Sequence, residues 1–177
     1  MSETIQLADS SQSKAIAVLV NKAYRPEANS GGWTHESDLV AGDRTSTEQV
    51  AQQITPSSPV LVAVRNDEIV ACVQITCDDS DCWIGMLATL PTEQNSGMGK
   101  KMLTAAEAYA VKNFAPARLM MSVLSSRSEL LSFYQRRGYK LTGKTTDYPL
   151  NTGVGTPRLN ELRVLELSKI PAEISQD

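Results

Sequence analysis

Residues 60–77 contain two runs of apolar and β-branched side chains joined by a two-residue turn. The first run extends from Val60 to Arg65, and the second has an apolar residue at every second position from Ile69 to Cys77. The residues between the runs, Asn66 and Asp67, favour a tight turn. This pattern predicts an antiparallel β-hairpin in the middle of the chain, and the other elements must be arranged around it.

Strand-like and helix-like stretches alternate on both sides of the hairpin. Three capping pairs predict helix starts, and a longer helix is expected to follow Gly99 and to end at Pro116. The capping pairs are Asp9 with Gln12, Thr45 with Glu48, and Ser126 with Glu129. The other strand-like stretches lie at residues 5–7, 83–90, 119–124, 139–145 and 159–167. The resulting element order is β-α-α-β-β-β-α-β-α-β-β.

This element order predicts a mixed α/β fold. Hairpins pair antiparallel, whereas the strands at 83–90 and 119–124 are joined by a helical crossover and should run parallel. We therefore expect a mostly antiparallel sheet with one parallel pair and helices on its faces. A chain of 177 residues with 41% hydrophobic and 21% charged residues fits a single domain, 1–177, with a core over about 5–169 and a frayed tail.

Charge and hydropathy exclude several partner classes. The net charge is −3, so we expect no nucleic-acid partner. The longest apolar run, Ala15 to Val20, is far shorter than the about 20 residues of a membrane span, so we expect no membrane partner. The N-terminus does not have the pattern of a signal peptide. We therefore expect a cytoplasmic protein.

The three cysteines, Cys72, Cys77 and Cys82, are expected to be structural. An odd number without a signal peptide is typical of a reducing cytoplasm. Cys82 lies near a turn, where we expect it to be exposed. The spacing is not that of a metal site, and the single histidine, His35, is distant in sequence. We therefore expect no metal.

A glycine-containing loop at residues 94–100 carries the clearest chemical signal. It lies between a predicted strand and a predicted helix, where unpaired backbone amides form an anion site suited to phosphates. It is not a Walker A loop, because Gln94 stands where that loop needs glycine and Lys101 where it needs Ser or Thr. It is not a dinucleotide fingerprint either, because Met102 replaces the last glycine. A plain strand-to-helix turn is the alternative.

Two motifs resemble those of the GNAT N-acetyltransferases. The first is Leu87-Ala88-Thr89-Leu90-Pro91 followed by Gln94-x-x-Gly97-x-Gly99, which resembles the acyl-CoA signature of that family. The second is Phe133-Tyr134-Gln135-Arg136-Arg137-Gly138-Tyr139, an aromatic pair followed by a glycine and another aromatic residue. The element order is similar to that of the family from about Ile5 to about Lys169. The resemblance implies a GNAT-like fold in which the parallel pair of strands splays apart around the cofactor.

The resemblance also implies a site and an activity. Acetyl-CoA would be the cosubstrate, and Tyr134 would protonate the departing thiolate, a role that suits a phenol with a pKa near 10. Alternatively, Tyr134 is a core aromatic residue, and a packed ring and a catalytic hydroxyl are compatible. A backbone amide near Leu87 could stabilise the oxyanion. The cofactor-binding residues would be Leu87, Ala88, Thr89, Gln94, Asn95, Ser96, Gly97, Met98, Gly99, Lys100 and Arg127.

Several positions depart from the family pattern. Asn95 stands where the family often has a glycine, although asparagine tolerates a positive φ. Arg127 stands where many members have an asparagine that contacts CoA. Some members have a glutamate base at the position of Gly85, and neither Gly85 nor Met86 can accept a proton. The base would then act from elsewhere or through water, or the amine would arrive neutral; candidates are His35, Glu36, Asp38 and Asp43.

The acceptor side is expected in two irregular segments. In residues 29–44, Trp33 is expected to line the acceptor pocket or to anchor the loop, and Glu36 to contact the substrate. In residues 147–157, glycines and prolines suit a mobile lid. Acidic residues in both segments favour a cationic acceptor.

The sequence thus predicts a GNAT-type N-acetyltransferase. It would transfer an acetyl group from acetyl-CoA to a primary amine of a small molecule or peptide, by direct attack in a ternary complex. A homodimer is typical of the family. Two alternatives stay open: a non-catalytic acyl-CoA-binding module that has lost its base, and a nucleotide-binding protein.

Overall fold

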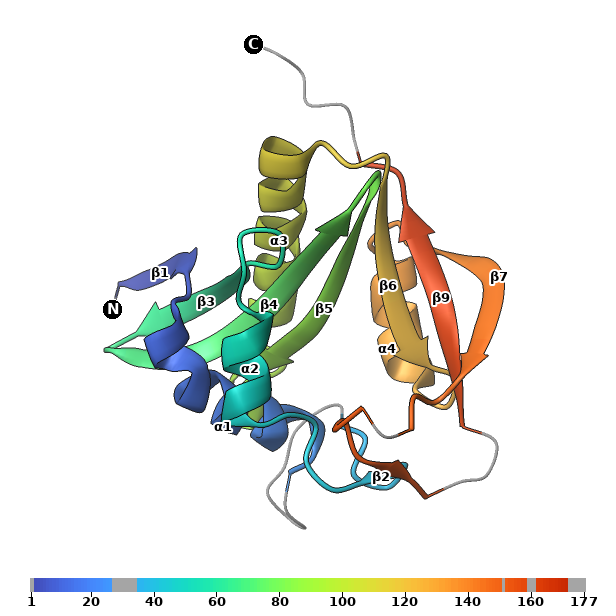
Figure 1. Ribbon diagram of the computed structural model, residues 1–177, viewed down its shortest axis with the longest axis horizontal. Coiled ribbons are helices and arrows are strands. Elements are labelled where there is room, and N and C mark those ends of the chain that lie inside the picture. The colour runs from blue at the N-terminus through green and yellow to red at the C-terminus, as the bar shows by residue number, and fades with distance from the viewer. Residues whose placement is uncertain (1, 27–34, 151, 159–161, 172–177) are drawn as a thin grey trace.

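The computed structural model describes residues 2–26, 35–150, 152–158 and 162–171 (Figure 1). Its main strands are β1 (Glu3–Leu7), β3 (Val60–Arg65), β4 (Glu68–Asp78), β5 (Asp81–Thr89), β6 (Arg118–Leu124), β7 (Lys140–Asp147) and β9 (Arg163–Lys169). Within the described residues these form one seven-stranded sheet in the order β1-β3-β4-β5-β6-β9-β7. Two short strands, β2 (Val40–Ala41) and β8 (Thr156–Pro157), pair separately.

Helices cover both faces of the main sheet, as predicted. The helices are α1 (Ser13–Tyr24), α2 (Thr47–Gln53), α3 (Met98–Phe114) and α4 (Ser128–Gln135), with 3-10 turns η1 (Ser10–Gln12) and η2 (Pro91–Glu93). Alternate residues of one strand enter different cores: Val60 and Val62 pack with α1 and α2, whereas Leu61 and Ala63 pack with α3. The period of two along a strand produces this division.

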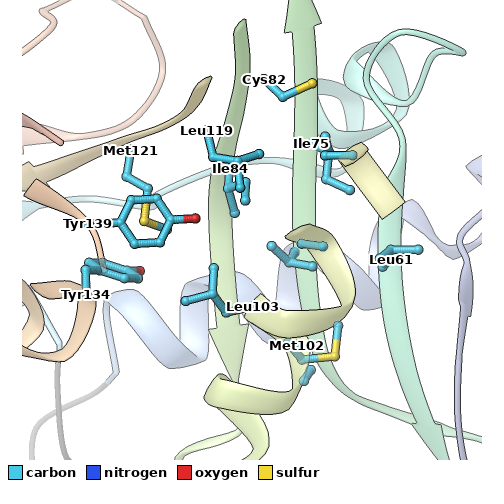
Figure 2. Close-up of a cluster of buried hydrophobic side chains, with 14 of the residues drawn as sticks. Leu61, Ile75, Cys82, Ile84, Met102, Leu103, Leu119, Met121, Tyr134 and Tyr139 are labelled. Atoms are coloured by element: carbon cyan, nitrogen blue, oxygen red, sulfur yellow. The ribbon is translucent and has the colours of Figure 1, made fainter. Parts of the chain in front are cut away.

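The core on the α3 side gathers aliphatic and methionine side chains. Figure 2 shows Met102 and Leu103 of α3 in one cluster with Ile75 and Ile84 of the sheet. Leu103 and Met102 are both fully buried. Dense apolar packing on both faces holds the central strands, whose ends carry the site described below.

The strands β5 and β6 form the predicted parallel pair and then separate. Their register pairs Asp81 with Arg118, Cys82 with Leu119, and Trp83 with Met120. Beyond these pairs the two strands diverge, as Figure 1 shows. The splayed arrangement leaves the later part of β5 with an open edge toward β6.

A bulge interrupts β5 where it diverges from β6. The pairing of β4 with β5 shifts register, so that Cys72 faces Ala88 while Gln74 faces Gly85. Met86 lies inside this bulge with φ 51°, a conformation that costs a residue with a Cβ about 1 kcal/mol or more. The buried Cys72 thiol donates to the Met86 carbonyl at 3.4 Å. The bulge thus presents the backbone of Met86 and Leu87 outside the regular ladder.

Two predicted helix N-caps are each wrong by one residue. The helix α2 is capped by Ser46 and Gln49 rather than Thr45 and Glu48, because Thr45 is buried and its amide and carbonyl both bond to the Asn21 side chain. The Asp9 pair does form a capping box, on η1.

The helix α4 also departs from its predicted start. Its N-cap is Arg127, which forms no side-chain cap, instead of Ser126. The Arg127 amide donates to the Leu124 carbonyl at 3.0 Å, and this turn delays the helix. At the other end of α4, Gly138 has φ 94°, the left-handed conformation predicted for a C-terminal cap.

The cysteines differ from expectation in one respect. A disulfide joins Cys77 to Cys82, which face each other across β4 and β5. Cys82 is buried rather than exposed. The reason is that β5 already begins at Asp81, so Cys82 belongs to the strand and not to the turn. Burial raises the pKa of the Cys72 thiol to about 12, so this cysteine is chemically unreactive and structural.

Candidate functional site

The loop that follows β5 borders a cavity of about 440 Å³, called here the loop cavity. It lies between the end of β5, the start of α3 and one side of α4. Nine of the predicted cofactor-binding residues line it: Leu87, Ala88, Thr89, Gln94, Asn95, Gly97, Gly99, Lys100 and Arg127. Arg136 and Arg137 also line it, so its described wall carries four basic residues and no acidic one. Such a surface suits a polyanionic ligand.

The backbone of this loop has the geometry of an anion site. Asn95 and Gly97 both have left-handed conformations, with φ 68° and 86°, and this confirms that asparagine accepts the positive φ. The first helical bond of α3 is donated by Lys101 to the Gly97 carbonyl at 3.0 Å. The amides that precede Lys101 in the helix therefore lie outside its ladder and point to the N-terminal end.

Two predicted cofactor-binding residues do not line the loop cavity. Met98 is buried in the core, where its apolar side chain packs against the sheet. The Ser96 amide and hydroxyl both donate to the Glu93 carbonyl, which closes a turn. The structure therefore assigns both side chains to the architecture of the loop.

A second cavity of about 400 Å³ lies in the gap between β5 and β6 and is called here the strand cavity. Its walls come from Trp83 to Leu87 of β5 and Met121 to Leu124 of β6. Residues of the two irregular segments close it, among them Glu36, Arg44 and Tyr148. The splayed parallel pair thus leaves a cavity between its two strands.

Five residues line both cavities and mark their junction: Tyr24, Leu87, Arg127, Leu130 and Tyr134. A molecule in one cavity would therefore meet a molecule in the other beside the Tyr134 phenol and the bulged backbone at Leu87. Burial is the main cause that raises the pKa of Tyr134 well above its ordinary value. The phenol consequently stays protonated through the neutral range and can donate a proton.

The ring of Tyr134 is also part of the core. It makes edge contacts with Phe133 and with Tyr139, at centroid distances of 5.3 Å and 6.1 Å, and Figure 2 shows Tyr134 and Tyr139 together at one side of the cluster. Packing and exposure of the hydroxyl at the junction are compatible, since an aromatic ring fixes its polar tip. The packed ring confirms the core interpretation of Tyr134, and its role as an acid stays a prediction.

Arg25, which the sequence analysis did not identify, fastens the two irregular segments together. Its guanidinium donates to Glu36 at 2.5 Å and 2.9 Å and to the Gly42 carbonyl at 2.6 Å. It also donates to Tyr148 and to the Val154 carbonyl at 3.1 Å and 2.8 Å. The segment predicted as a lid is thus anchored to a buried arginine.

Glu36 lines the strand cavity, but its carboxylate is shared by two arginines. Besides Arg25, the Arg127 guanidinium lies 3.6 Å from it, and all three side chains are about 5% exposed. A buried carboxylate between two guanidiniums is held as an anion and fixed in position. Glu36 therefore organises this wall.

Arg127 lies at the junction, and its guanidinium contacts other side chains of the protein. Its guanidinium stacks over the Tyr24 ring at 5.7 Å and also approaches Glu129 at 3.8 Å. Arg44 stacks over the same ring at 5.5 Å. Burial is the main cause that raises the pKa of the Tyr24 phenol.

The remaining predicted acceptor residues are placed as follows. His35, Asp38 and Asp43 are not among the residues that line either cavity. Gly85 lines the strand cavity and has no side chain that could accept a proton. Trp33 lies outside the described residues.

Sequence reasoning missed Tyr24 and Arg25, and it placed Arg44 and Tyr148 in the two acceptor segments without giving either side chain a role. Each is an ordinary residue type at a helix end or in a loop, and none belongs to a motif. The sequence signal for Tyr24 and Arg25 is weak. Both lie where the apolar stripe of α1 ends, at the end of the helix that points toward the cavities.

Two general properties of the described residues concern membranes and metal ions. None of their helices is long and apolar enough to cross a membrane. Likewise, within this part of the chain, histidines, cysteines and carboxylates do not gather in a group of three that could bind a metal ion.

Comparison with known proteins supports the resemblance at the level of sequence. Residues 56–141 match the model of the acetyltransferase (GNAT) domain family. This segment contains both motifs, the loop cavity and most of the junction. No curated protein sequence matches the chain.

Solved structures of GNAT acetyltransferases have the same fold. The ribosomal-protein-S18-alanine N-acetyltransferase from Escherichia coli is 14% identical, with a TM-score of 0.71 over 99% of this chain and 98% of that one. The PaiA N-acetyltransferase from Thermoplasma acidophilum, in complex with coenzyme A, is 16% identical with a TM-score of 0.72 over 96% and 99%. A GNAT family acetyltransferase from Elizabethkingia anophelis with acetyl-CoA bound is 20% identical, with 0.61 over 95% and 97%.

Proposed function

This chain carries a GNAT acetyltransferase domain on the GNAT fold, and from this premise we propose that it transfers an acetyl group from acetyl-CoA to a primary amine. The observation that carries the proposal is the meeting of two cavities at Tyr134 and Leu87, where β5 and β6 separate. Two substrates can occupy adjacent cavities and react at their junction. We extend the proposal to residues 1–177 as one catalytic domain.

Acetyl-CoA would occupy the loop cavity. Four basic side chains and the amides at the start of α3 suit its phosphates. Leu87, Ala88 and Thr89 would face the pantetheine arm, which brings the thioester to the junction. Gln94, Asn95, Gly97, Gly99 and Lys100 would form the phosphate cradle, with Ser96 and Met98 holding the loop in shape.

The amine would occupy the strand cavity and attack the thioester carbonyl directly. A new C–N bond forms as the C–S bond breaks, and the thiolate takes a proton from Tyr134. The proton that the amine nitrogen loses restores the phenol, so the products are the N-acetyl amine and CoA. The place of Tyr134 at the junction of the two cavities supports this role, and the phenol carries its proton before the step.

The bulge in β5 would stabilise the charge that develops on the carbonyl oxygen. Met86 and Leu87 lie between the paired residues Gly85 and Ala88, so their backbone is displaced from the ladder at the junction. A backbone amide fixed at such a place can donate to an oxyanion. We propose the amide of Leu87 for this part.

Proton removal from the amine would not rely on a carboxylate at Gly85. Glu36, the predicted acidic residue in the strand cavity, is already paired with Arg25 and Arg127. We propose that the amine binds as its neutral form or loses its proton to water. A base at the position of Gly85 is therefore dispensable.

The first experiment is calorimetric titration with acetyl-CoA, with ATP as the control ligand. We expect acetyl-CoA to bind with micromolar affinity and ATP not to bind. Acetyl-CoA binding followed by mass-spectrometric detection of an acetylated amine supports the enzyme. Binding without turnover of any amine in a broad panel would instead identify an acyl-CoA-binding module, and absence of binding would overturn both.

We also propose an oligomeric state and a location for the protein. The chain would form a homodimer, and it would act in the cytoplasm. The Cys77–Cys82 disulfide counts against the second, because disulfides are rare in reducing compartments.

A further inference from the structure

We propose that the amine acceptor of this enzyme carries a carboxylate, and that Arg44 binds it. The acceptor would be a small amino acid-like molecule, with its amine directed to the junction and its carboxylate toward Arg44. This inference rests on the proposed acetyl transfer and adds the chemical class of the acceptor.

Arg44 is held in place on the wall of the strand cavity. Its backbone amide donates to the Asn21 side chain at 2.8 Å, and the next amide, from Thr45, donates to the same oxygen at 3.1 Å. The Asn21 amide group returns a bond to the Thr45 carbonyl at 3.0 Å. The Arg44 guanidinium then lies over the Tyr24 ring at 5.5 Å. A stacked guanidinium on a fixed backbone is pre-organised for a ligand.

The charges around the strand cavity leave Arg44 without a carboxylate of its own. Among the lining residues, Glu36 is engaged by Arg25 and Arg127, and Asp147 is engaged by Arg163. Within the described part of the chain, by contrast, the Arg44 guanidinium has no carboxylate within the 4.0 Å of an ion pair. Glu36 is thus neutralised by buried arginines, Asp147 belongs to an exposed ion pair, and Arg44 lines the cavity beside them.

This balance reverses the expectation from the sequence. The acidic residues of the two irregular segments favoured a cationic acceptor, but pairing with arginines removes the attraction that they would exert. A polyamine would meet Arg44 with no compensating free anion on this wall. A carboxylate would instead form a charge-assisted, two-pronged contact with the guanidinium.

The position of Arg44 also fits the geometry of transfer. Tyr24 lines both cavities and lies beneath the Arg44 guanidinium, so Arg44 is one aromatic ring away from the junction. An acceptor held there by its carboxylate can extend its amine toward Leu87 and Tyr134. Arg44 would therefore bind and orient the acceptor and take no part in proton transfer.

The test compares matched acceptors at saturating acetyl-CoA. For a panel of L-amino acids, the corresponding amino acid amides and the corresponding decarboxylated amines, kcat/KM is measured by mass spectrometry of the acetylated product. We expect at least one amino acid to be preferred over its own amide by tenfold or more. Amides or decarboxylated amines that react as well as the acids would overturn the inference and leave the acetyltransferase intact.

Variants locate the preference at Arg44. In Arg44→Gln the ratio of acid to amide kcat/KM should fall by tenfold or more, and Arg44→Lys should retain part of it. Arg118→Gln, which changes an exposed arginine paired with Asp81, is the matched control and should keep the original ratio. An unchanged ratio in Arg44→Gln would overturn the inference.

Two further readouts separate the possible failures. Circular dichroism and calorimetric binding of acetyl-CoA show that each Arg44 variant is folded, and Arg44→Lys serves if Arg44→Gln is not. If the unmodified protein binds acetyl-CoA but acetylates no member of this panel, the inference fails, and the proposed function fails with it only when the broad amine panel is also unreactive.

Discussion

The loop cavity takes all but two of its lining residues from residues 87–100 and 127–137, whereas the strand cavity draws on β5, β6, the end of α1 and both irregular segments. The first therefore comes from two continuous stretches of chain that carry motifs. The second is assembled from side chains far apart in sequence, and one buried arginine, Arg25, joins the segments that close it.

The two cavities also differ in the kind of group that they offer. The loop cavity presents backbone amides and basic side chains at a helix start. Any suitable loop can form this arrangement, and it suits one kind of ligand, a phosphate-bearing one. The strand cavity presents individual side chains such as Arg44 and Tyr148. Changes there can alter the acceptor without disturbing the binding of acetyl-CoA, which explains how one fold can serve different substrates.

The largest expected effect separates the scaffolds of the two cavities. Arg25→Ala removes the hydrogen bonds to Glu36 and to three other acceptor groups, and breaking such a buried pair should lower the free energy of unfolding by about 3 kcal/mol. We expect denaturant unfolding to show this loss, and acceptor turnover to fall while the Kd of acetyl-CoA stays within about threefold.

The matched control for Arg25 is Arg118→Ala. Its ion pair with Asp81 is half exposed, so the loss should be less than about 1 kcal/mol. A larger fall in acetyl-CoA affinity than in acceptor turnover for Arg25→Ala would contradict the separation of the two cavities.

The next prediction concerns the junction, which belongs to both cavities. Tyr134→Phe keeps the packed ring and removes the acid, so kcat should fall by about 100-fold, or about 2.7 kcal/mol in activation free energy. The Kd of acetyl-CoA should change little. Steady-state kinetics and calorimetry measure the two, and Tyr109→Phe, on α3 and outside both cavities, should behave as the unmodified protein.

The pH profile adds a second check on Tyr134. Burial raises the pKa of this phenol, so the active, protonated form persists above the ordinary tyrosine pKa of about 10. The kcat of the unmodified enzyme should therefore not decline between pH 7 and about pH 9.5. A decline within this range that disappears in Tyr134→Phe would show that the phenol titrates early and would contradict the assignment.

The smallest effects should come from the backbone of the loop cavity. Gly97→Ala adds a Cβ at φ 86° that would meet no described atom within 4 Å, so its cost is conformational, about 1 kcal/mol. We expect up to about tenfold weaker acetyl-CoA binding by calorimetry, with the acid-to-amide preference unchanged. The matched change Asn95→Gly, at φ 68°, should stay within about 0.5 kcal/mol. Equal losses in both variants would contradict the role given to positive φ.

The sequence predicted best where a local pattern has a local cause. The hairpin, the crossover and the left-handed Gly138 follow from alternation, helical spacing and turn chemistry, and the structure confirms them. The helix starts at Thr45 and Ser126 were wrong because long-range contacts decided them: Asn21 bonds to Thr45, and Arg127 turns inward to Glu36.

The same distinction applies to the site. The sequence alone determined the resemblance to GNAT enzymes, the loop with its positive φ residues and the candidate acid Tyr134, since each depends on residues close together in the chain. Only the tertiary structure decided that Arg25 and Arg127 neutralise Glu36, that Arg44 faces the strand cavity, and that Tyr24 lies at the junction. The physical reason is that charge balance in a buried site depends on which side chains meet in space, and residues as distant as Arg25 and Tyr148 meet only when the sheet and its loops have folded.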